Sequence, residues 1–327
     1  MAVSLFIHLE KWPIAGKFAI SRGAKTTAEV VVAELADGRH RGRGECVPYA
    51  RYGETVEAVA AAIQAMREPL AGGLGRMGLQ ERMPAGAARN ALDCAFWDFE
   101  AKRTGTPVHA LAGLPSPRPL VTAYTISLDT PPRMAAAAAK AAAYRLLKVK
   151  LGAAGDPERI RAVRAAAPDC ELIADANEGW NPQNLPENLA ACAEAGVTLV
   201  EQPLPAGADQ CLAAFPHAIP ICADESVHTC ASLGALAGKY DAVNIKLDKT
   251  GGLTEALRLA AEAERLDFGL MVGCMVATSL AMAPAHLLAR RARLVDLDGP
   301  LLLAQDRPHG LMYEGSLVYP PTPELWG

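Results

Sequence analysis

The sequence predicts an α/β protein in which an α+β first third is followed by a (β/α) barrel of the TIM type. Three observations lead to this prediction. After a proline-rich joint at residues 115–119, eight short apolar runs alternate with alanine-rich helical segments. Most of these runs end in charged residues that lie about one β/α unit apart. Hydrophobic residues make up 51% of the 327 residues and charged residues 21%, which is typical of a globular protein.

The first third contains two extended runs and two helical patterns. The second extended run holds a turn at Asp37-Gly38, as in a β-hairpin. The second helical pattern places apolar residues such as Leu92 and Phe96 on one face, so we expect that face to be buried. The extended runs cover residues 5–14 and 29–46, and the helices cover 54–71 and 85–103, with a glycine-rich loop at 72–75.

The rest of the chain alternates strand-length and helix-length segments. A doubly wound sheet of two halves would give the same alternation, but no G-x-G-x-x-G motif follows the first strand to support it. Helices are expected between the strands, for example at residues 133–144, 157–166, 185–195 and 253–266. The eight expected strands are residues 120–127, 146–151, 171–176, 197–202, 219–223, 242–247, 270–274 and 293–297.

Composition argues against several classes of protein. A net charge of −4 and an aromatic content of 5% do not suit a nucleic-acid-binding surface. The start of the chain lacks a basic region and reaches Glu10 too early for a signal peptide. Residues 268–289 carry no charge, but Pro284 and His286 among many small residues favour a buried strand and helix over a membrane span. Eight cysteines without Cys-x-x-Cys spacing predict free thiols and a cytoplasmic location.

Three acids end neighbouring strands of the expected barrel. Asp175, Glu201 and Asp224 close its third, fourth and fifth strands, at the end where barrel active sites lie. Three converging carboxylates repel one another without a cation, and ligands that are all oxygen suit Mg²⁺. We therefore predict a metal site on these three acids. The competing interpretation is three independent acids that cap helices or face water.

Lysines stand on opposite sides of the same ring. Lys148 and Lys150 share one face of the second strand, and Lys246 lies on the sixth, four strands away in a ring of eight. Lys150 and Lys246 would face each other across a bound substrate, as a two-base proton transfer requires. Lysine is a base at neutral pH only when nearby positive charge lowers its pKa, which Lys148 and a metal can supply. The competing interpretation is that these lysines form structural salt bridges with the strand acids.

A second pair of acids lies on the eighth strand. Asp296 and Asp298 share one face and are far from the three predicted metal ligands. We expect them to bind a cationic group of the substrate, such as an ammonium. A second metal site or a helix cap would also account for this pair.

Several motifs resemble those of the enolase superfamily, muconate-lactonizing subgroup, for which a lysine base and magnesium are a known pattern. They are Lys148-Val-Lys150, Asp175-Ala-Asn177, Val200-Glu201-Gln202-Pro203, Ala223-Asp224-Glu225-Ser226 and Asn244-Ile-Lys246. A narrower resemblance, to the L-Ala-D/L-Glu epimerases among the dipeptide epimerases, depends on four further segments. These are residues 296–300, 246–252, 48–54 and 84–93.

The resemblance implies a fold, a reaction and a set of site residues. It implies an α+β capping domain (residues 1–116, joined by the C-terminal tail 305–327) over a (β/α)₇β barrel (residues 117–304). It implies Mg²⁺-dependent 1,1-proton transfer at the α-carbon of a dipeptide's C-terminal residue, through a metal-stabilised enolate, in murein peptide metabolism. It implies one Mg²⁺ per subunit on Asp175, Glu201 and Asp224, Lys150 and Lys246 as the acid/base pair, Lys148 in support, Asp296 and Asp298 on the α-ammonium, Thr125 and Cys274 lining the pocket, and Arg22 on the glutamyl carboxylate.

Further functions remain open from the sequence. Within the superfamily they are a dipeptide epimerase of other specificity, an N-succinylamino acid racemase or an o-succinylbenzoate synthase. The substrates of the last two enzymes lack a free ammonium group that Asp296 and Asp298 could bind. Outside the superfamily's reactions, a Schiff-base aldolase using Lys150 or Lys246 and a catalytically silent barrel that senses a peptide are also compatible with these residues. The expected partner is a small dipeptide, with no nucleic acid and no membrane, and homo-oligomer formation is left open.

Overall fold

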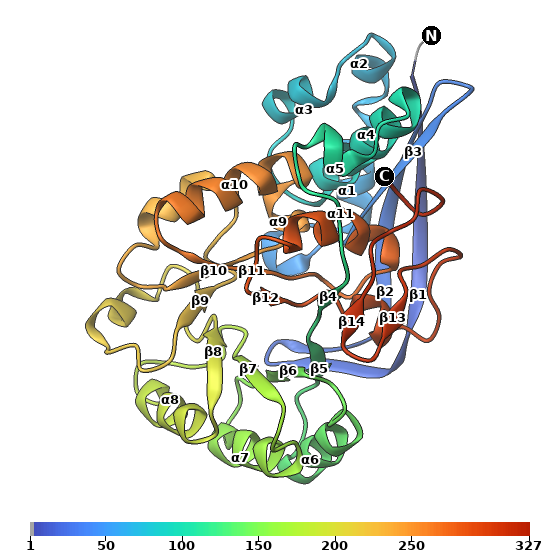
Figure 1. The fold of residues 1–327 in the computed structure, drawn as a ribbon. Helices are drawn as coiled ribbons and strands as arrows, with labels where there is room; N and C mark the ends of the chain where they lie inside the picture. Colours follow the sequence, from blue (N-terminus) through green and yellow to red (C-terminus); the bar gives the residue numbers. More distant parts are fainter. Residues whose placement is uncertain (1–2) are drawn as a thin grey trace.

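The computed structural model describes residues 3–327. Its centre is an eight-stranded parallel sheet in the order β12-β11-β10-β9-β8-β7-β6-β5, which curls into a barrel (Figure 1). The N–H of Ala123, just before the first strand, donates to the carbonyl of Val295 in the last strand at 2.8 Å. The two ends of the sheet therefore meet, and the predicted TIM-like barrel with an N-terminal α+β region is confirmed.

The barrel strands are short, and their connections differ in kind. Helices cover the outside after most strands, whereas the connections after β8 and β9 contain only 3₁₀ turns, η2 (Gln210–Ala214) and η3 (Cys230–Ala235). The strands are β5 (Tyr124–Ile126), β6 (Leu146–Lys150), β7 (Glu171–Asp175), β8 (Val197–Glu201), β9 (Ile221–Ala223), β10 (Ala242–Ile245), β11 (Gly269–Val272) and β12 (Leu294–Val295). The helices are α6 (Pro131–Lys140), α7 (Asp156–Ala166), α8 (Leu185–Glu194), α9 (Leu247–Thr250), α10 (Leu253–Arg265), α11 (Ser279–Ala289) and the 3₁₀ turn η4 (Gly299–Leu302).

The N-terminal region is an antiparallel sheet in the order β1-β2-β3 with helices packed on one face. Gly42 and Gly44 in β3 allow close contact, because a Cβ at either position would collide with the backbone of the long helix α4. The elements are β1 (Ser4–Ile20), β2 (Gly23–Ala36), β3 (Arg41–Cys46), η1 (Ala50–Tyr52), α1 (Val56–Gln64), α2 (Arg67–Ala71), α3 (Arg76–Arg82), α4 (Ala87–Thr104) and α5 (Val108–Leu111).

The end of the chain returns to the N-terminal region. A small sheet joins β13 (Tyr313–Glu314), β14 (Leu317–Val318) and β4 (Leu120–Val121). The Trp326 indole then donates to the carbonyl of Cys94 at 3.0 Å, within α4. We propose from these contacts that residues 3–116 with the tail 305–327 form the cap and that residues 117–304 form the barrel. Residues 1–2 of the predicted cap lie outside the described residues.

Several predicted segments differ from the observed elements. The strand expected at 120–127 is divided, because Leu120–Val121 pairs with β14 of the tail and only Tyr124–Ile126 joins the barrel. The strand expected at 5–14 continues to Ile20 through a bulge between Pro13 and Phe18. The helix expected at 54–71 is two helices, α1 and α2.

Contacts from the cap hold the segment that follows the sixth barrel strand. The buried Arg89 in α4 donates to the carbonyls of Thr250 (2.7 Å) and Gly251 (3.1 Å). The neighbouring Asn90 side chain donates to Asp248 Oδ1 at 2.8 Å. Because these groups immediately follow Lys246, the cap helps to fix the position of that lysine. Over residues 3–327, no helix is both long and apolar enough to span a bilayer.

His286 in α11 gives a prediction about acid stability. It is fully buried, its Nε2 lies 3.4 Å from the carbonyl of Val318, and burial lowers its pKa to about 4. The unfolded chain therefore takes up this proton first, so stability is lost as the pH falls from 6.5 towards 4. At pH 5 the loss amounts to about 2 kcal/mol.

The measurement is urea unfolding of the wild type and the His286→Leu variant at pH 7 and pH 5. The fall in unfolding free energy between these pH values should be smaller in the variant by about 2 kcal/mol. Other groups titrate in both proteins, so only this difference is informative. Equal falls in the two proteins would show that His286 is not held neutral.

Candidate active site

The barrel interior changes from apolar to polar along seven of its eight strands. A fully apolar layer closes the barrel at the amino-terminal ends of its strands. Because side chains alternate along a strand, the next inward residues are two positions further along the chain. These are charged or polar except in β11, where Gly273 follows Met271. For example, Leu146 is followed by Lys148, and Ile173 by Asp175. The apolar layer takes one residue from each strand position: Ala123, Leu146, Ile173, Leu199, Cys222, Ala242, Met271 and Leu294.

Strand register brings the three predicted metal ligands together. Lys150 pairs with Asp175, and Asp175 pairs with Glu201, at the carboxyl ends of neighbouring strands. Asp224 directly follows β9, whose Cys222 pairs with Glu201. The exposed fractions of Asp175, Glu201 and Asp224 are 0%, 0% and 2%. Three buried acids at one level are costly unless cations accompany them.

Lysines supply those cations in this structure. Lys148 Nζ lies 2.6 Å from Glu201, 2.7 Å from Asp296 and 3.2 Å from Asp175. Lys150 Nζ lies 2.6 Å from Asp175. The lysines thus form the salt bridges with strand acids that the competing sequence-based interpretation predicts.

The other acid, Asp224, is held by two lysines. Lys246 Nζ lies 2.6 Å from its Oδ2, and Lys249 Nζ lies 2.5 Å from its Oδ1 and also donates to its backbone carbonyl. Burial would raise the pKa of Asp224, but Lys246 and Lys249 lower it well below its usual range. For Glu201 burial and the charge of Asp175 prevail, and its pKa rises to about 7.

The acids do not converge on one point in this arrangement. Within residues 3–327, no group of three or more His, Cys, Asp or Glu side chains is placed to hold a metal ion as it stands. Lys148 lies between Asp175 and Glu201, and Lys246 lies between Asp224 and Glu201, 3.8 Å from the latter. The donor set itself suits Mg²⁺, because it consists of three buried carboxylates from adjacent strands.

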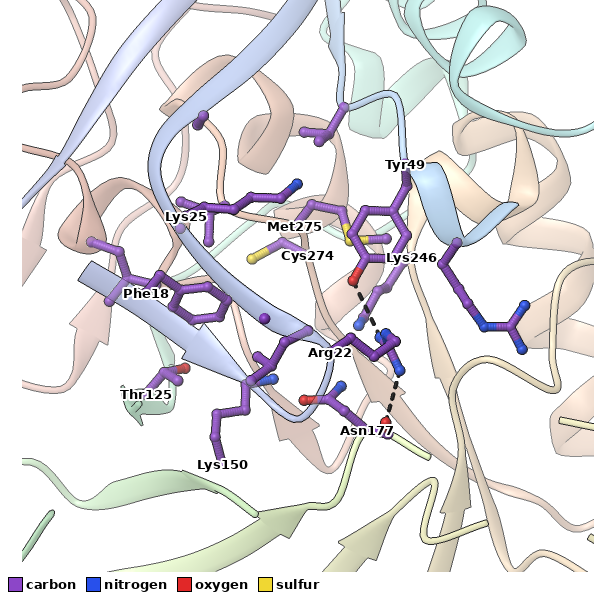
Figure 2. A pocket seen from close by; sticks show the side chains of 18 of the residues that line it. Phe18, Arg22, Lys25, Tyr49, Thr125, Lys150, Asn177, Lys246, Cys274 and Met275 are labelled. Atoms are coloured by element: carbon purple, nitrogen blue, oxygen red, sulfur yellow. Dashed lines mark hydrogen bonds between the residues drawn. The ribbon is translucent and has the colours of Figure 1, made fainter. Parts of the chain in front are cut away.

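A cavity of about 550 Å³ lies between the cap and the barrel mouth. Lys150 and Lys246 both line it, and their strands β6 and β10 are four positions apart in the ring of eight. The two ammonium groups therefore approach the cavity from opposite sides. The hairpin of β1 and β2 crosses its mouth and brings Phe18 and Arg22 over it (Figure 2). Thr125 and Cys274 line it as well.

The two acids after the last strand lie on the wall of this cavity. Asp298 accepts a hydrogen bond from the Thr125 N–H at 2.7 Å, and burial and Asp296 raise its pKa to about 7. Asp296 Oδ2 pairs with the Lys148 ammonium that also contacts Glu201 and Asp175, so the expectation that this acid lies far from the predicted metal ligands is wrong. Within residues 3–327, no group donates a hydrogen bond to its buried Oδ1. This buried acceptor is therefore left for a donor that a bound substrate could supply.

Arg22 is held above the cavity by the barrel. Its guanidinium lies 2.7 Å from Glu225 and 3.1 Å from Glu178, and donates to the carbonyl of Asn177 at 2.8 Å and the hydroxyl of Tyr49 at 3.2 Å. Figure 2 shows the last two bonds. Burial opposes ionisation, but Glu225 and Tyr49 raise the pKa of Arg22 above its usual value. This arginine is a fixed positive charge facing the cavity.

Two buried polar residues of this centre have no role in the sequence-based prediction. Lys249 lies one helical turn after Lys246 and holds Asp224, as described above. The Asn244 side chain donates to Glu201 Oε1 at 2.7 Å. Strand alternation indicates the second, because Asn244 and Lys246 lie two residues apart on one face. No local sequence pattern indicates that Glu178 and Glu225 are the partners of Arg22.

Comparison with protein families agrees with this geometry. A family described as mandelate racemase/muconate lactonizing enzyme, N-terminal domain, matches residues 2–113, and one described as enolase C-terminal domain-like matches residues 133–322. The chain belongs to the mandelate racemase/muconate lactonizing enzyme family. The resemblance to the enolase superfamily in its motifs is thereby confirmed.

Relatives of this family member are similar over nearly their whole length. L-Ala-D/L-Glu epimerase of Escherichia coli (strain K12) is 48% identical over 306 residues, 93% of this chain and 95% of the relative. N-acetyl-D-glutamate racemase of Pseudoalteromonas sp is 46% identical over 300 residues, 91% and 95% of the two chains. Because such relatives are epimerases and racemases, this mandelate racemase/muconate lactonizing family member is an isomerase.

Solved structures give the same result. An enolase family member from Agrobacterium tumefaciens, described as having homology to dipeptide epimerases, contains sodium and L-Ala-L-Glu. It is 57% identical, covers 99% of this chain and 100% of its own, and superposes with a TM-score of 0.98. Two other structures of this fold are dipeptide epimerases complexed with Mg and a dipeptide.

Proposed function

We propose that this isomerase is a Mg²⁺-dependent dipeptide epimerase that inverts the α-carbon of the C-terminal residue of L-Ala-D/L-Glu. The observation that carries the proposal is the placement of Lys150 and Lys246 on opposite sides of one cavity, beside three buried carboxylates. The same residues suit dipeptides of other sequence. The assignment of glutamate as the second residue of the substrate therefore depends on Arg22. A role in murein peptide metabolism follows from that substrate.

The reaction needs one proton acceptor and one proton donor on opposite faces of a carbon atom. The neutral amine of one lysine takes the α-proton, and the C–H electron pair moves into the substrate's carboxylate to give an enolate. The ammonium of the opposite lysine then gives a proton to the other face, which inverts the centre. Each lysine ends a turnover in the protonation state its partner began with, so the reverse reaction uses the same two groups.

Asp175, Glu201 and Asp224 would hold the metal, after Lys148 and Lys246 withdraw from between them. Mg²⁺ held by these acids would supply positive charge that stabilises the negative charge of the enolate. The chain's own contribution is to keep those acids buried and in register. Lys249 donates a hydrogen bond to Asp224, and Asn244 donates one to Glu201, so two of the three acids are held by neighbouring side chains.

The second pair of acids supports a substrate with a free amino group. The buried Asp296 Oδ1 accepts no hydrogen bond from the part of the chain that the structure describes, so a substrate ammonium would satisfy it. An N-acyl amino acid, such as the substrate named for the racemase relative, carries no charge at this position. This favours a dipeptide over N-acetylglutamate or a succinylated amino acid.

The test is a substrate comparison with the purified enzyme and Mg²⁺. Chiral chromatography should show conversion of L-Ala-L-Glu to L-Ala-D-Glu, and slower or no inversion of N-acetyl-glutamate and N-succinyl amino acids. Faster inversion of an N-acyl amino acid than of any dipeptide would contradict the assignment of Asp296 and Asp298 to an ammonium.

Arg22 gives a prediction about specificity. Because its guanidinium faces the cavity as a fixed charge, we expect it to bind the acidic side chain of the second residue. Arg22→Met should lower kcat/KM for L-Ala-L-Glu relative to L-Ala-L-Leu about thirtyfold, equivalent to about 2 kcal/mol. The control is Arg161→Met, whose exposed guanidinium lies on α7. An unchanged preference for glutamate in the Arg22 variant would remove Arg22 from the substrate site.

A further inference from the structure

We propose that Glu178 is a positioning residue that sets the preference for an acidic second residue by fixing Arg22 and closing two cap segments onto the barrel. The inference rests on the proposed dipeptide epimerase function and extends it to a residue outside the predicted site. Glu178 lies three residues after Asp175, on the loop that follows β7. It does not line the cavity and acts only through its neighbours.

The Glu178 carboxylate joins its own loop to three other segments of the chain. Oε1 accepts hydrogen bonds from Arg51 Nη2 at 2.7 Å and from the Ala206 N–H at 2.8 Å. Oε2 accepts from Arg51 Nε at 2.7 Å and from Arg22 Nη1 at 3.1 Å. Arg51 comes from η1 of the cap, Arg22 from the β1–β2 hairpin, and Ala206 from the loop after β8. A bidentate pair of this type fixes direction as well as distance.

The backbone at this position is itself unusual. Asn177 and Glu178 have φ angles of 43° and 64°, in the left-handed region that non-glycine residues seldom adopt. The Glu178 N–H donates to the carbonyl of Gln202 at 2.9 Å, and the Asn177 carbonyl accepts from Ser21 Oγ and Arg22 Nη1, both at 2.8 Å. The surrounding contacts therefore hold a loop conformation that aims Glu178 at the cap.

Burial makes these contacts strong enough to matter. Only 7% of the Glu178 side chain is exposed, against 27% for Arg22 and 37% for Arg51. The acid is thus more buried than its cations, and its loss would leave both guanidiniums with more freedom. Glu225 would still pair with Arg22 at 2.7 Å, so the arginine would remain near the site but in a less defined position. We expect substrate binding to weaken without loss of the chemical step.

The test compares Glu178→Gln with the wild type on L-Ala-L-Glu and L-Ala-L-Leu. Glutamine keeps an acceptor for the Ala206 N–H but removes the charge. We expect kcat/KM for L-Ala-L-Glu to fall about tenfold, mainly through a higher KM, and kcat/KM for L-Ala-L-Leu to change less than about twofold. In an Arg22→Met background the same substitution should no longer alter the preference, because its effect passes through Arg22.

The matched control is Glu194→Gln, which removes an Arg–Glu pair between α7 and α8 far from the site. Equal losses on both dipeptides would show a merely structural role and overturn the proposal. So would an unchanged preference, or a gain with L-Ala-L-Glu, which would make Glu178 a competitor of the substrate.

Hydrogen exchange separates this inference from the proposed function. Amides of residues 20–25 and 50–53 should exchange faster in Glu178→Gln than in Glu194→Gln, without any substrate present. Unchanged exchange would overturn the positioning role even in an active enzyme. Failure of the wild type to epimerise any dipeptide would instead refute the proposed function, and with it the part of the inference that concerns specificity.

Discussion

Replacing Lys150 or Lys246 by glutamine is expected to lower the rate of epimerisation at least about a thousandfold while leaving one half-reaction intact. The remaining lysine still takes the α-proton from the epimer that faces it and exchanges that proton with solvent. Lys150→Gln and Lys246→Gln should therefore each exchange the α-proton of one epimer only, and the two variants should act on opposite epimers. Deuterium incorporation into each pure epimer measures this directly.

A neutral lysine substitution elsewhere serves as the control. Lys140 is exposed at the end of α6, and Lys140→Gln should exchange and epimerise both substrates like the wild type. If either Lys150→Gln or Lys246→Gln epimerises both substrates at the wild-type rate, a two-base mechanism with these residues is wrong. If both variants exchange the same epimer, the lysines do not stand on opposite faces of the substrate.

The second large effect is expected from Glu201→Gln. The variant should bind Mg²⁺ at least about a hundredfold more weakly and lose epimerisation to a similar degree, because a neutral amide replaces one of three carboxylate ligands. Its stability without Mg²⁺ should be little affected. The pKa of Glu201 is already raised to about 7, and glutamine mimics the protonated acid with an amide that can bond to Asn244.

Two measurements separate metal loss from misfolding in this variant. Titration calorimetry reports Mg²⁺ affinity, and thermal unfolding without Mg²⁺ should differ from the wild type by no more than about 3 °C. Addition of Mg²⁺ should raise the unfolding temperature of the wild type only. Wild-type Mg²⁺ affinity in Glu201→Gln would exclude Glu201 as a ligand, and the proposed site with it.

The candidate site could be predicted from the sequence because, in a parallel barrel, the spacing of residues along the chain determines which of them lie side by side at the strand ends. Strand ends meet at one level, so acids one β/α unit apart, such as Asp175 and Glu201, become neighbours in register. The alternation of strand side chains places Lys148 and Lys150 on one face for the same reason. These relations need no long-range information beyond the fold class.

The features that were not predicted depend on distant partners. Leu120–Val121 leaves the expected first strand because it pairs with β14, almost two hundred residues later. β1 passes Pro13 and Gly16, which are usually strand-ending signals, because β2 continues to pair with it beyond the bulge. Arg22 meets Glu178 and Glu225 only after the cap closes on the barrel. Local propensity contains no information about such contacts.

The ammonium groups between the acids are a further difference from the prediction. A metal site on Asp175, Glu201 and Asp224 assumes carboxylates that face a common point, whereas Lys148 and Lys246 lie between them here. The electrostatic reason is the same in both cases, since buried acids require nearby positive charge. If Mg²⁺ binds these acids as proposed, both ammonium groups have to leave their positions between them.

The most direct test of the central claim is a proton NMR time course in D₂O. The sample contains the enzyme, Mg²⁺ and L-Ala-D-Glu or L-Ala-L-Glu, with a parallel sample in EDTA. The proposed function predicts loss of the glutamyl α-proton signal, appearance of the other epimer, and neither event with EDTA. Persistence of the α-proton with both dipeptides in the presence of Mg²⁺, or exchange that continues undiminished in EDTA, would contradict it.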